Sequence, residues 1–183
     1  SKEYIHWDKN HSANYDITVK KSNTTDNTLK KDDNGKYAEY VVDVSSEKGT
    51  PDVITLNDVL EAGKMSVDTS KFTYTITKNG QQVGGEYTAN VTASSNNDNN
   101  NHKYNLTATL PKLNAGESCQ IKYKYYYDTS LCDSGNESQA SNKVTGESIN
   151  KKSNEKVIDT SSSVIKYTRD DLDKTGAYDS DSQ

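Results

Sequence analysis

Three residues, Lys21, Asp58 and Asn142, combine reactive side chains with positions where burial is expected. Each is an even number of residues from apolar residues of its own predicted strand, and such residues point to the same face. An amine, a carboxyl group and a carboxamide are therefore expected on apolar faces. The apolar residues that share these faces are Ile17 and Val19, Ile54 and Leu56, and Val144.

These three groups can react if the fold brings them together. Burial disfavours the charged form of both an amine and a carboxylic acid, so a neutral Lys21 and a protonated Asp58 can coexist in a core. The neutral amine is a nucleophile, while the acid can polarise the Asn142 carbonyl and shuttle protons as ammonia leaves. Proximity supplied by the fold is worth about 7–11 kcal/mol in such reactions. The predicted product is a Lys21–Asn142 isopeptide bond assisted by Asp58.

Ordinary structural roles remain open for the same residues. Lys21 could extend to a sheet edge, Asp58 could cap a turn before Glu61, and Asn142 could simply begin a strand. Lys20 stands beside Lys21 and becomes the alternative partner if the strand contains a bulge.

The rest of the chain predicts the strands that must position these groups. Short segments of alternating apolar residues recur between polar turns, which favours an all-β protein built as an antiparallel β-sandwich. No helical periodicity and no internal repeat is visible. The expected strands cover residues 15–21, 38–44, 53–60, 72–76, 87–91, 104–108, 119–127, 142–146 and 157–167, with polar loops at 22–36, 94–101 and 128–141.

Composition narrows the classes of function. The 183 residues carry a net charge of −5 without a basic stripe, which argues against nucleic-acid binding. Hydrophobic residues make up 30% of the chain, and no apolar segment is long enough to span a membrane. The chain begins with Ser rather than Met, so we expect it to be part of a longer protein.

Other chemistries find little support. Residues 1–11 hold Trp7 and two histidines without ligand spacing, and residues 171–182 begin like a calcium loop but end in Ser182 where Glu is needed. We therefore expect no metal and no cofactor. Cys119 is expected to be buried and Cys132 to lie in a loop; whether they are bonded is left open. No catalytic triad or phosphate-binding loop is present, so the chain is not expected to be an enzyme beyond one self-cross-linking turnover.

The order of five segments resembles the isopeptide-forming repeat domains of Gram-positive fimbrial and adhesin surface proteins. These segments are ITVKKS, KYAEYVVDVSS, VITLNDVL, LPKLNAGESCQIKYKY and SNKVTGES. The resemblance implies an immunoglobulin-like fold, Lys21 and Asn142 as the cross-linked pair and Asp58 as the assisting acid. The sequence departs from the family pattern at Glu61, where the family has proline.

The sequence therefore predicts an N-terminal lead-in at 1–11, an immunoglobulin-like domain at 12–168 and an acidic tail at 169–183. The expected function is that of a stalk module in a bacterial adhesin or pilus-like protein, extracellular and anchored to the cell wall through regions outside this chain. Its expected partners are neighbouring domains of the same protein, with no nucleic acid and no membrane contact. The alternative is a module that binds a host glycan or protein through the loops at 96–101 and 128–137, without a cross-link.

Overall fold

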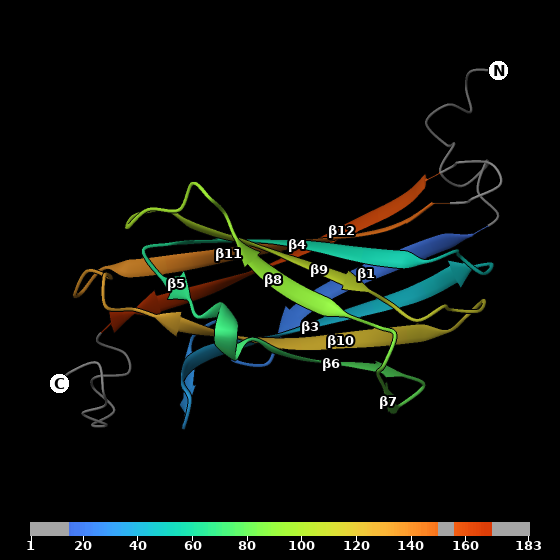
Figure 1. Ribbon diagram of the computed structural model, residues 1–183, viewed down its shortest axis with the longest axis horizontal. Helices are drawn as coiled ribbons and strands as arrows, with labels where there is room; N and C mark the ends of the chain where they lie inside the picture. The colour runs from blue at the N-terminus through green and yellow to red at the C-terminus, as the bar shows by residue number, and fades with distance from the viewer. Residues whose placement is uncertain (1–14, 150–155, 170–183) are drawn as a thin grey trace, which may run out of the picture.

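The computed structural model describes residues 15–149 and 156–169, which form two antiparallel β-sheets packed face to face. Figure 1 shows the sheets as two layers. One sheet has the order β1-β3-β10-β6-β7, and in it β2 also pairs with β3 and β5 also pairs with β10. The other sheet has the order β12-β11-β4-β9-β8. The predicted antiparallel β-sandwich is confirmed.

Twelve strands and one short 3-10 turn make up the described fold. The strands are β1 (Asp16–Asn23), β2 (Lys30–Asp32), β3 (Gly35–Lys48), β4 (Ile54–Gly63), β5 (Ser66–Val67), β6 (Thr73–Lys78), β7 (Gln81–Val83), β8 (Ala89–Ala93), β9 (His102–Thr109), β10 (Ser118–Asp128), β11 (Glu137–Ile149) and β12 (Lys156–Thr168), and the turn η2 covers Thr69–Lys71.

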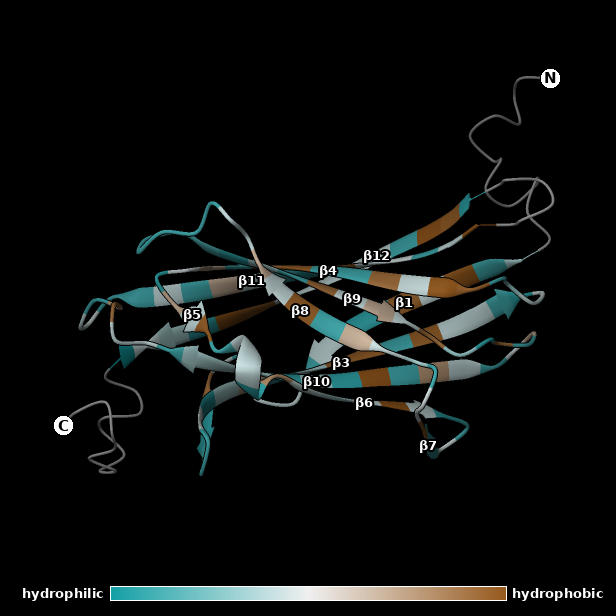
Figure 2. Ribbon diagram, viewed as in Figure 1, coloured by the Kyte–Doolittle hydropathy of each residue, from teal (hydrophilic) through white to brown (hydrophobic). Residues whose placement is uncertain are grey.

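Alternating side chains build the core between the sheets. Apolar and polar residues follow one another along the long strands, as the banded colouring of β4 and β10 in Figure 2 shows. The inward residues join into one hydrophobic cluster that includes Tyr40, Leu56 and Ile121. Cys119 is buried as predicted, and both Cys119 and Cys132 are free thiols.

Several strands extend further than predicted, and two of these carry site residues. β4 continues through Gly63, with Leu60 and Ala62 buried, so Asp58 lies in the middle of a buried face instead of at its end. β11 begins at Glu137, before Asn142. The sequence did not predict this start because the first outward residues of β11 are polar and resemble a loop. The interpretations of Asp58 as a turn cap and Asn142 as a strand start are therefore wrong.

β1 is the edge strand of the first sheet and also contacts the second sheet. Its main pairing is with β3, but its other edge faces β12, whose side chains accept hydrogen bonds from it. The Lys21 amide N–H donates to Ser161 Oγ at 2.9 Å, and the Val19 amide N–H donates to Asp159 Oδ2 at 2.8 Å. These contacts fix the register of β1 against the second sheet.

A glycine lets β1 approach β11. A Cβ at Gly146 would lie 2.6 Å from Val19 Cγ2 and 3.3 Å from Leu56 Cδ2, both closer than ordinary carbon contacts. Only glycine therefore permits this packing without a shift of its neighbours. The close approach brings β1, which carries Lys21, onto the strand that carries Asn142.

Some predictions concern segments outside the described residues. The lead-in at 1–11, with Trp7 and its histidines, lies outside them, as does the calcium-like segment at 171–182.

The polar run at 94–101 forms the tip of the β8–β9 hairpin, as predicted. The loop predicted at 22–36 is only partly a loop, because it contains β2 and the buried Leu29.

Candidate functional site

Lys21 and Asp58 meet in the centre of the sandwich. Lys21 Nζ lies 2.8 Å from Asp58 Oδ2, and both side chains are fully shielded from solvent. Lys21 comes from β1 and Asp58 from β4, so this pair joins opposite sheets. Lys20, the alternative, is exposed, and the pairing of β1 with β3 is regular from Ile17 onward. The predicted inward position of Lys21 is confirmed.

Tyr123 of β10 completes a three-membered polar contact. Its hydroxyl accepts a hydrogen bond from Lys21 Nζ and donates one to Asp58 Oδ2 at 2.5 Å. Aromatic rings enclose the amine: Nζ lies 4.3 Å from the centre of the Tyr40 ring and 4.7 Å from that of Tyr123. The amine thus has two hydrogen-bond acceptors and contacts two aromatic rings.

Asn142 lies on the same buried face as Asp58. On β4 and β11, Asp58 is paired with Val144 and Leu60 with Asn142, so Asp58 and Asn142 are diagonal neighbours on adjacent strands. Diagonal neighbours in antiparallel sheets are about 7–8 Å apart, within reach of long side chains. Asn142 is 1% exposed, which confirms its predicted burial.

The Lys21 side chain extends over the strand that carries Asn142. The backbone of Lys21 contacts Ser161 of β12, and its amine reaches Asp58 of β4. β11 is the strand between β12 and β4, and its Val144 pairs with both Ser161 and Asp58, so the path crosses β11 at Val144, two residues from Asn142. Tyr40 is a shared neighbour, because its ring lies under the amine and its hydroxyl adjoins the Asn142 amide.

Three buried polar atoms of this cluster lack a hydrogen-bond partner among the described residues: Asp58 Oδ1, Asn142 Oδ1 and Asn142 Nδ2. The Asn142 amide lies beside the Tyr40 hydroxyl without the alignment of a hydrogen bond. Leaving a buried polar group unpaired costs about 1–3 kcal/mol, so such groups in a native core require an explanation.

Burial shifts the pKa of two members of the cluster, Lys21 and Tyr123. It lowers the pKa of the Lys21 amine below its ordinary 10.5, although the charge and hydrogen bond of Asp58 oppose the shift. Burial also raises the pKa of Tyr123 well above its usual range, and the charge of Asp58 adds to the rise. Tyr123 therefore stays protonated and can donate to Asp58, while Lys21 becomes neutral more readily than an exposed lysine.

Sequence reasoning identified three members of this cluster and missed Tyr123. The only signal was the alternation of β10, which places Tyr123, Tyr125 and Tyr127 on the inward face together. Alternation does not distinguish these tyrosines. Choosing Tyr123 requires the register between β10 and β3, which pairs Tyr123 with Tyr40.

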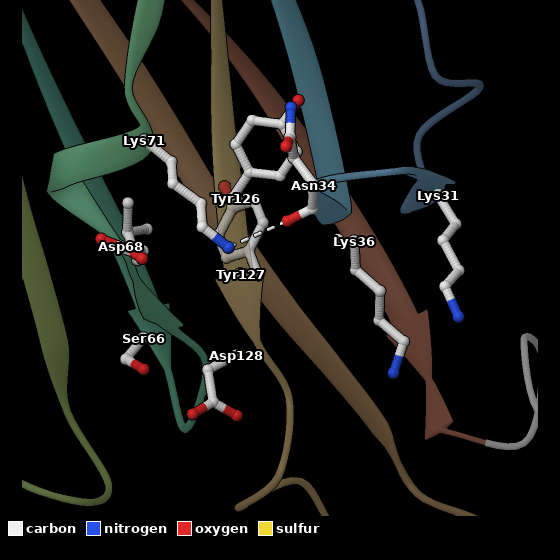
Figure 3. Close-up of a pocket in the computed structure, with 11 residues that line it drawn as sticks. Lys31, Asn34, Lys36, Ser66, Asp68, Lys71, Tyr126, Tyr127 and Asp128 are labelled. Carbon is white, nitrogen blue, oxygen red and sulfur yellow. Dashed lines mark hydrogen bonds between the residues drawn. The ribbon is translucent and has the colours of Figure 1, made fainter. Parts of the chain in front are cut away.

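A separate pocket of about 390 Å³ lies at the surface near η2 and the start of β3. Figure 3 shows three lysines around it, with the Lys71 amine directed to the Asn34 carbonyl oxygen at 3.0 Å. Asp68 and Asp128 contribute opposite charge, and each caps a local turn. The pocket is polar and mixed in charge, and none of the three predicted site residues lines it.

Polar groups in both loops of the alternative interpretation form hydrogen bonds or ion pairs within the protein. In the 96–101 loop, Asp98 Oδ1 accepts the amide N–H groups of Asn100 and Asn101. In the 128–137 loop, Cys132 is buried and Asp133 pairs with Lys64 at 3.0 Å. Several polar groups of these loops are therefore already engaged within the protein.

No group of three or more His, Cys, Asp or Glu side chains within residues 15–149 and 156–169 could hold a metal ion. Within the same residues, no helix has the length and apolar character needed to cross a membrane.

Comparisons with known proteins do not assign a family. No family model matches the sequence, and no curated protein is significantly similar to it. The solved structures that it is similar to include AvmM, which catalyses macrocyclization in alchivemycin A biosynthesis, with 10% identity, a TM-score of 0.47, and coverage of 85% of this chain and 89% of AvmM.

Two collagen-binding domains are also similar. The collagen-binding domain of a Staphylococcus aureus adhesin has 15% identity and a TM-score of 0.38, with coverage of 81% of this chain and 97% of that domain. The collagen-binding subdomain ACE19 of an Enterococcus faecalis surface protein has 11% identity and a TM-score of 0.36, with coverage of 82% and 95%. All three TM-scores are below 0.5, and the proteins differ in activity, so these similarities carry no argument about function.

Proposed function

We propose that this chain is an immunoglobulin-like structural module of a bacterial cell-surface adhesin or pilus-like protein, locked by an isopeptide bond between Lys21 and Asn142. The observation that carries the proposal is the buried cluster itself. Lys21 and Asp58 are fully buried and 2.8 Å apart, and Asn142 on the next strand has a carboxamide without hydrogen bonds to the described residues.

A cross-link accounts for the unpaired carboxamide. In the proposed reaction the neutral Lys21 amine attacks Asn142 Cγ, the Nζ–Cγ bond forms and the Cγ–Nδ2 bond breaks. Nδ2 takes up a proton and leaves as ammonia, and the amine loses one. Asp58 gives the first proton and receives the second, so it acts once as acid and once as base. The unpaired Nδ2 then no longer exists in the mature protein.

The bond would give the module its mechanical role. It would tie β1 to β11 and enclose about 120 residues between Lys21 and Asn142. Tension applied at the two ends would pass through the bond and bypass the enclosed strands. Only residues before Lys21 and after Asn142 could then extend, which suits a stalk segment that bears load.

Single-molecule force spectroscopy tests this function. The module, held between marker domains, is stretched as wild type, as Asn142→Ala and as the control Lys20→Ala, which alters only an exposed amine. The proposal predicts that Asn142→Ala releases about 400 Å more chain than wild type, since about 120 residues become extensible. Equal extension of wild type and Asn142→Ala would reject the mechanical role.

The proposal includes no turnover on other molecules. The reaction consumes its own reactants once, so the chain is a self-modifying structural protein and not an enzyme. We further propose that it is extracellular, anchored through other parts of a longer protein, with its neighbouring domains as partners. A host ligand remains the alternative, and loss of binding on a glycan array after trimming of the 96–101 or 128–137 loop would support it.

A further inference from the structure

We propose that Tyr123 is a further catalytic residue of the cross-linking reaction: its hydroxyl orients the attacking amine and determines which oxygen of Asp58 serves the carboxamide. This inference rests on the proposed Lys21–Asn142 bond. It is carried by the two hydrogen bonds of the Tyr123 hydroxyl, one from Lys21 Nζ and one to Asp58 Oδ2.

The first role follows from the geometry of a neutral amine. Such an amine has two N–H groups and one lone pair. Lys21 Nζ has two acceptors among the described residues, the Tyr123 hydroxyl oxygen and Asp58 Oδ2. With both N–H groups bonded, the lone pair points away from both acceptors and is free to attack. Without the Tyr123 hydroxyl, the amine could rotate about its remaining hydrogen bond.

The second role follows from the two oxygens of Asp58. Oδ2 receives hydrogen bonds from both Tyr123 and Lys21, while Oδ1 has no partner in the described part of the chain. Oδ1 is therefore the oxygen available to Asn142. We assign it the acidic proton that passes to Nδ2 as ammonia leaves, and we assign Oδ2 the proton that the attacking Nζ gives up. The remaining N–H of the new amide keeps its hydrogen bond to Tyr123.

Neighbouring tyrosines do not have these contacts, which makes one of them a control. The Tyr125 hydroxyl is buried in the same aromatic cluster and has no hydrogen-bond partner among the described residues. The Tyr40 hydroxyl lies 3.3 Å from that of Tyr127, and Tyr40 meets the amine with its ring. Tyr125→Phe therefore removes an equally buried hydroxyl without changing the contacts of Lys21.

The experiment follows the reaction during folding of the full chain. Wild type, Tyr123→Phe and Tyr125→Phe are isolated in denaturant before folding, where each mass should equal that of its sequence, and are then refolded by dilution. Circular dichroism reports folding and intact mass reports loss of about 17 Da. We expect Tyr123→Phe to fold but to cross-link at least about tenfold more slowly, and Tyr125→Phe to stay within about twofold of wild type.

The pH profile separates catalysis from a loss of structure. The titratable groups facing Nζ are Asp58 from β4, Tyr40 from β3 and Tyr123 from β10. Removing the Tyr123 acceptor disfavours the ammonium form, so the midpoint of the rate profile should move to lower pH while its plateau falls. A merely structural defect would lower the folded fraction without moving the midpoint.

The outcomes are distinguishable. Equal rates for the two Phe variants, beside a wild type that loses ammonia, would overturn the role of Tyr123 and leave the cross-link intact. A slower Tyr123→Phe with an unmoved midpoint would also overturn it. A folded wild type that keeps its full mass would overturn the proposed function and the role of Tyr123 together.

Discussion

Asn142→Ala should change stability little in a protein without the cross-link and much more in a protein that has it. Neither polar atom of the Asn142 side chain has a hydrogen bond to the described residues, so its truncation removes none that the structure shows. In an unlinked protein, the relief of two unpaired buried atoms should offset the lost packing, and stability should stay within about 1 kcal/mol of wild type.

In a cross-linked protein the same substitution opens a loop of about 120 residues. The chain-entropy relation for a cross-link of this span gives a loss of about 5 kcal/mol. For a chain of this size, each kcal/mol corresponds to about 2–4 °C, so Tm should fall by about 10–20 °C. Urea unfolding and thermal denaturation of the two proteins measure the difference.

A double-mutant cycle isolates the bond from local packing. Lys21→Met, Asn142→Ala and the double variant each lack the bond. The two single losses of unfolding free energy therefore each include the contribution of the bond, whereas the loss in the double variant includes it only once. The coupling free energy should be about 5 kcal/mol, larger than ordinary contacts give. Additive losses, or an Asn142→Ala variant as stable as wild type, would refute the reasoning.

Three further outcomes are expected. Asp58→Asn, which keeps the size of the side chain but cannot accept or release protons as a carboxyl group does, should fold and retain the full sequence mass; a loss of about 17 Da would remove Asp58 from the reaction. Gly146→Ala should cost about 1–3 kcal/mol in urea unfolding, because its Cβ would displace Val19; a neutral effect would show that β1 can move away freely. In Asn142→Ala the Lys21 amine stays free with a lowered pKa, so between that pKa and 10.5 the unfolded chain binds more protons and the free energy of unfolding should rise with pH, a rise absent when Lys21→Met is added.

The alternation of apolar and polar residues predicted much of the fold and the burial of three side chains of the site. The even spacing of Lys21, Asp58 and Asn142 from apolar residues was sufficient to place each on an inward face, and the structure confirms their burial. Strand ends were harder, because polar outward residues such as Gln139 and Ser141 look like a loop when the strand partner is unknown.

Contacts between distant strands were beyond the sequence patterns. Tyr123 could not be separated from Tyr125 without the pairing of β10 and β3. The contact between β1 and β12 depends on side chains that accept hydrogen bonds, such as Ser161, and such residues have no characteristic spacing in sequence. Gly146 matters because of a neighbour on another strand, Val19, and such steric limits arise only in the packed structure.

The intact mass of the folded, reduced protein, followed by a tryptic map, tests the cross-link most directly. The Lys21–Asn142 bond predicts a mass about 17 Da below that of the sequence. It also predicts a branched peptide joining residues 21–30 to 125–143, since trypsin does not cleave after a linked Lys21. The map is needed because a succinimide at Asn34 or Asn79, each followed by glycine, would lose the same mass without a branch. A folded protein with the full sequence mass, or a deficit without the branched peptide, would contradict the Lys21–Asn142 bond.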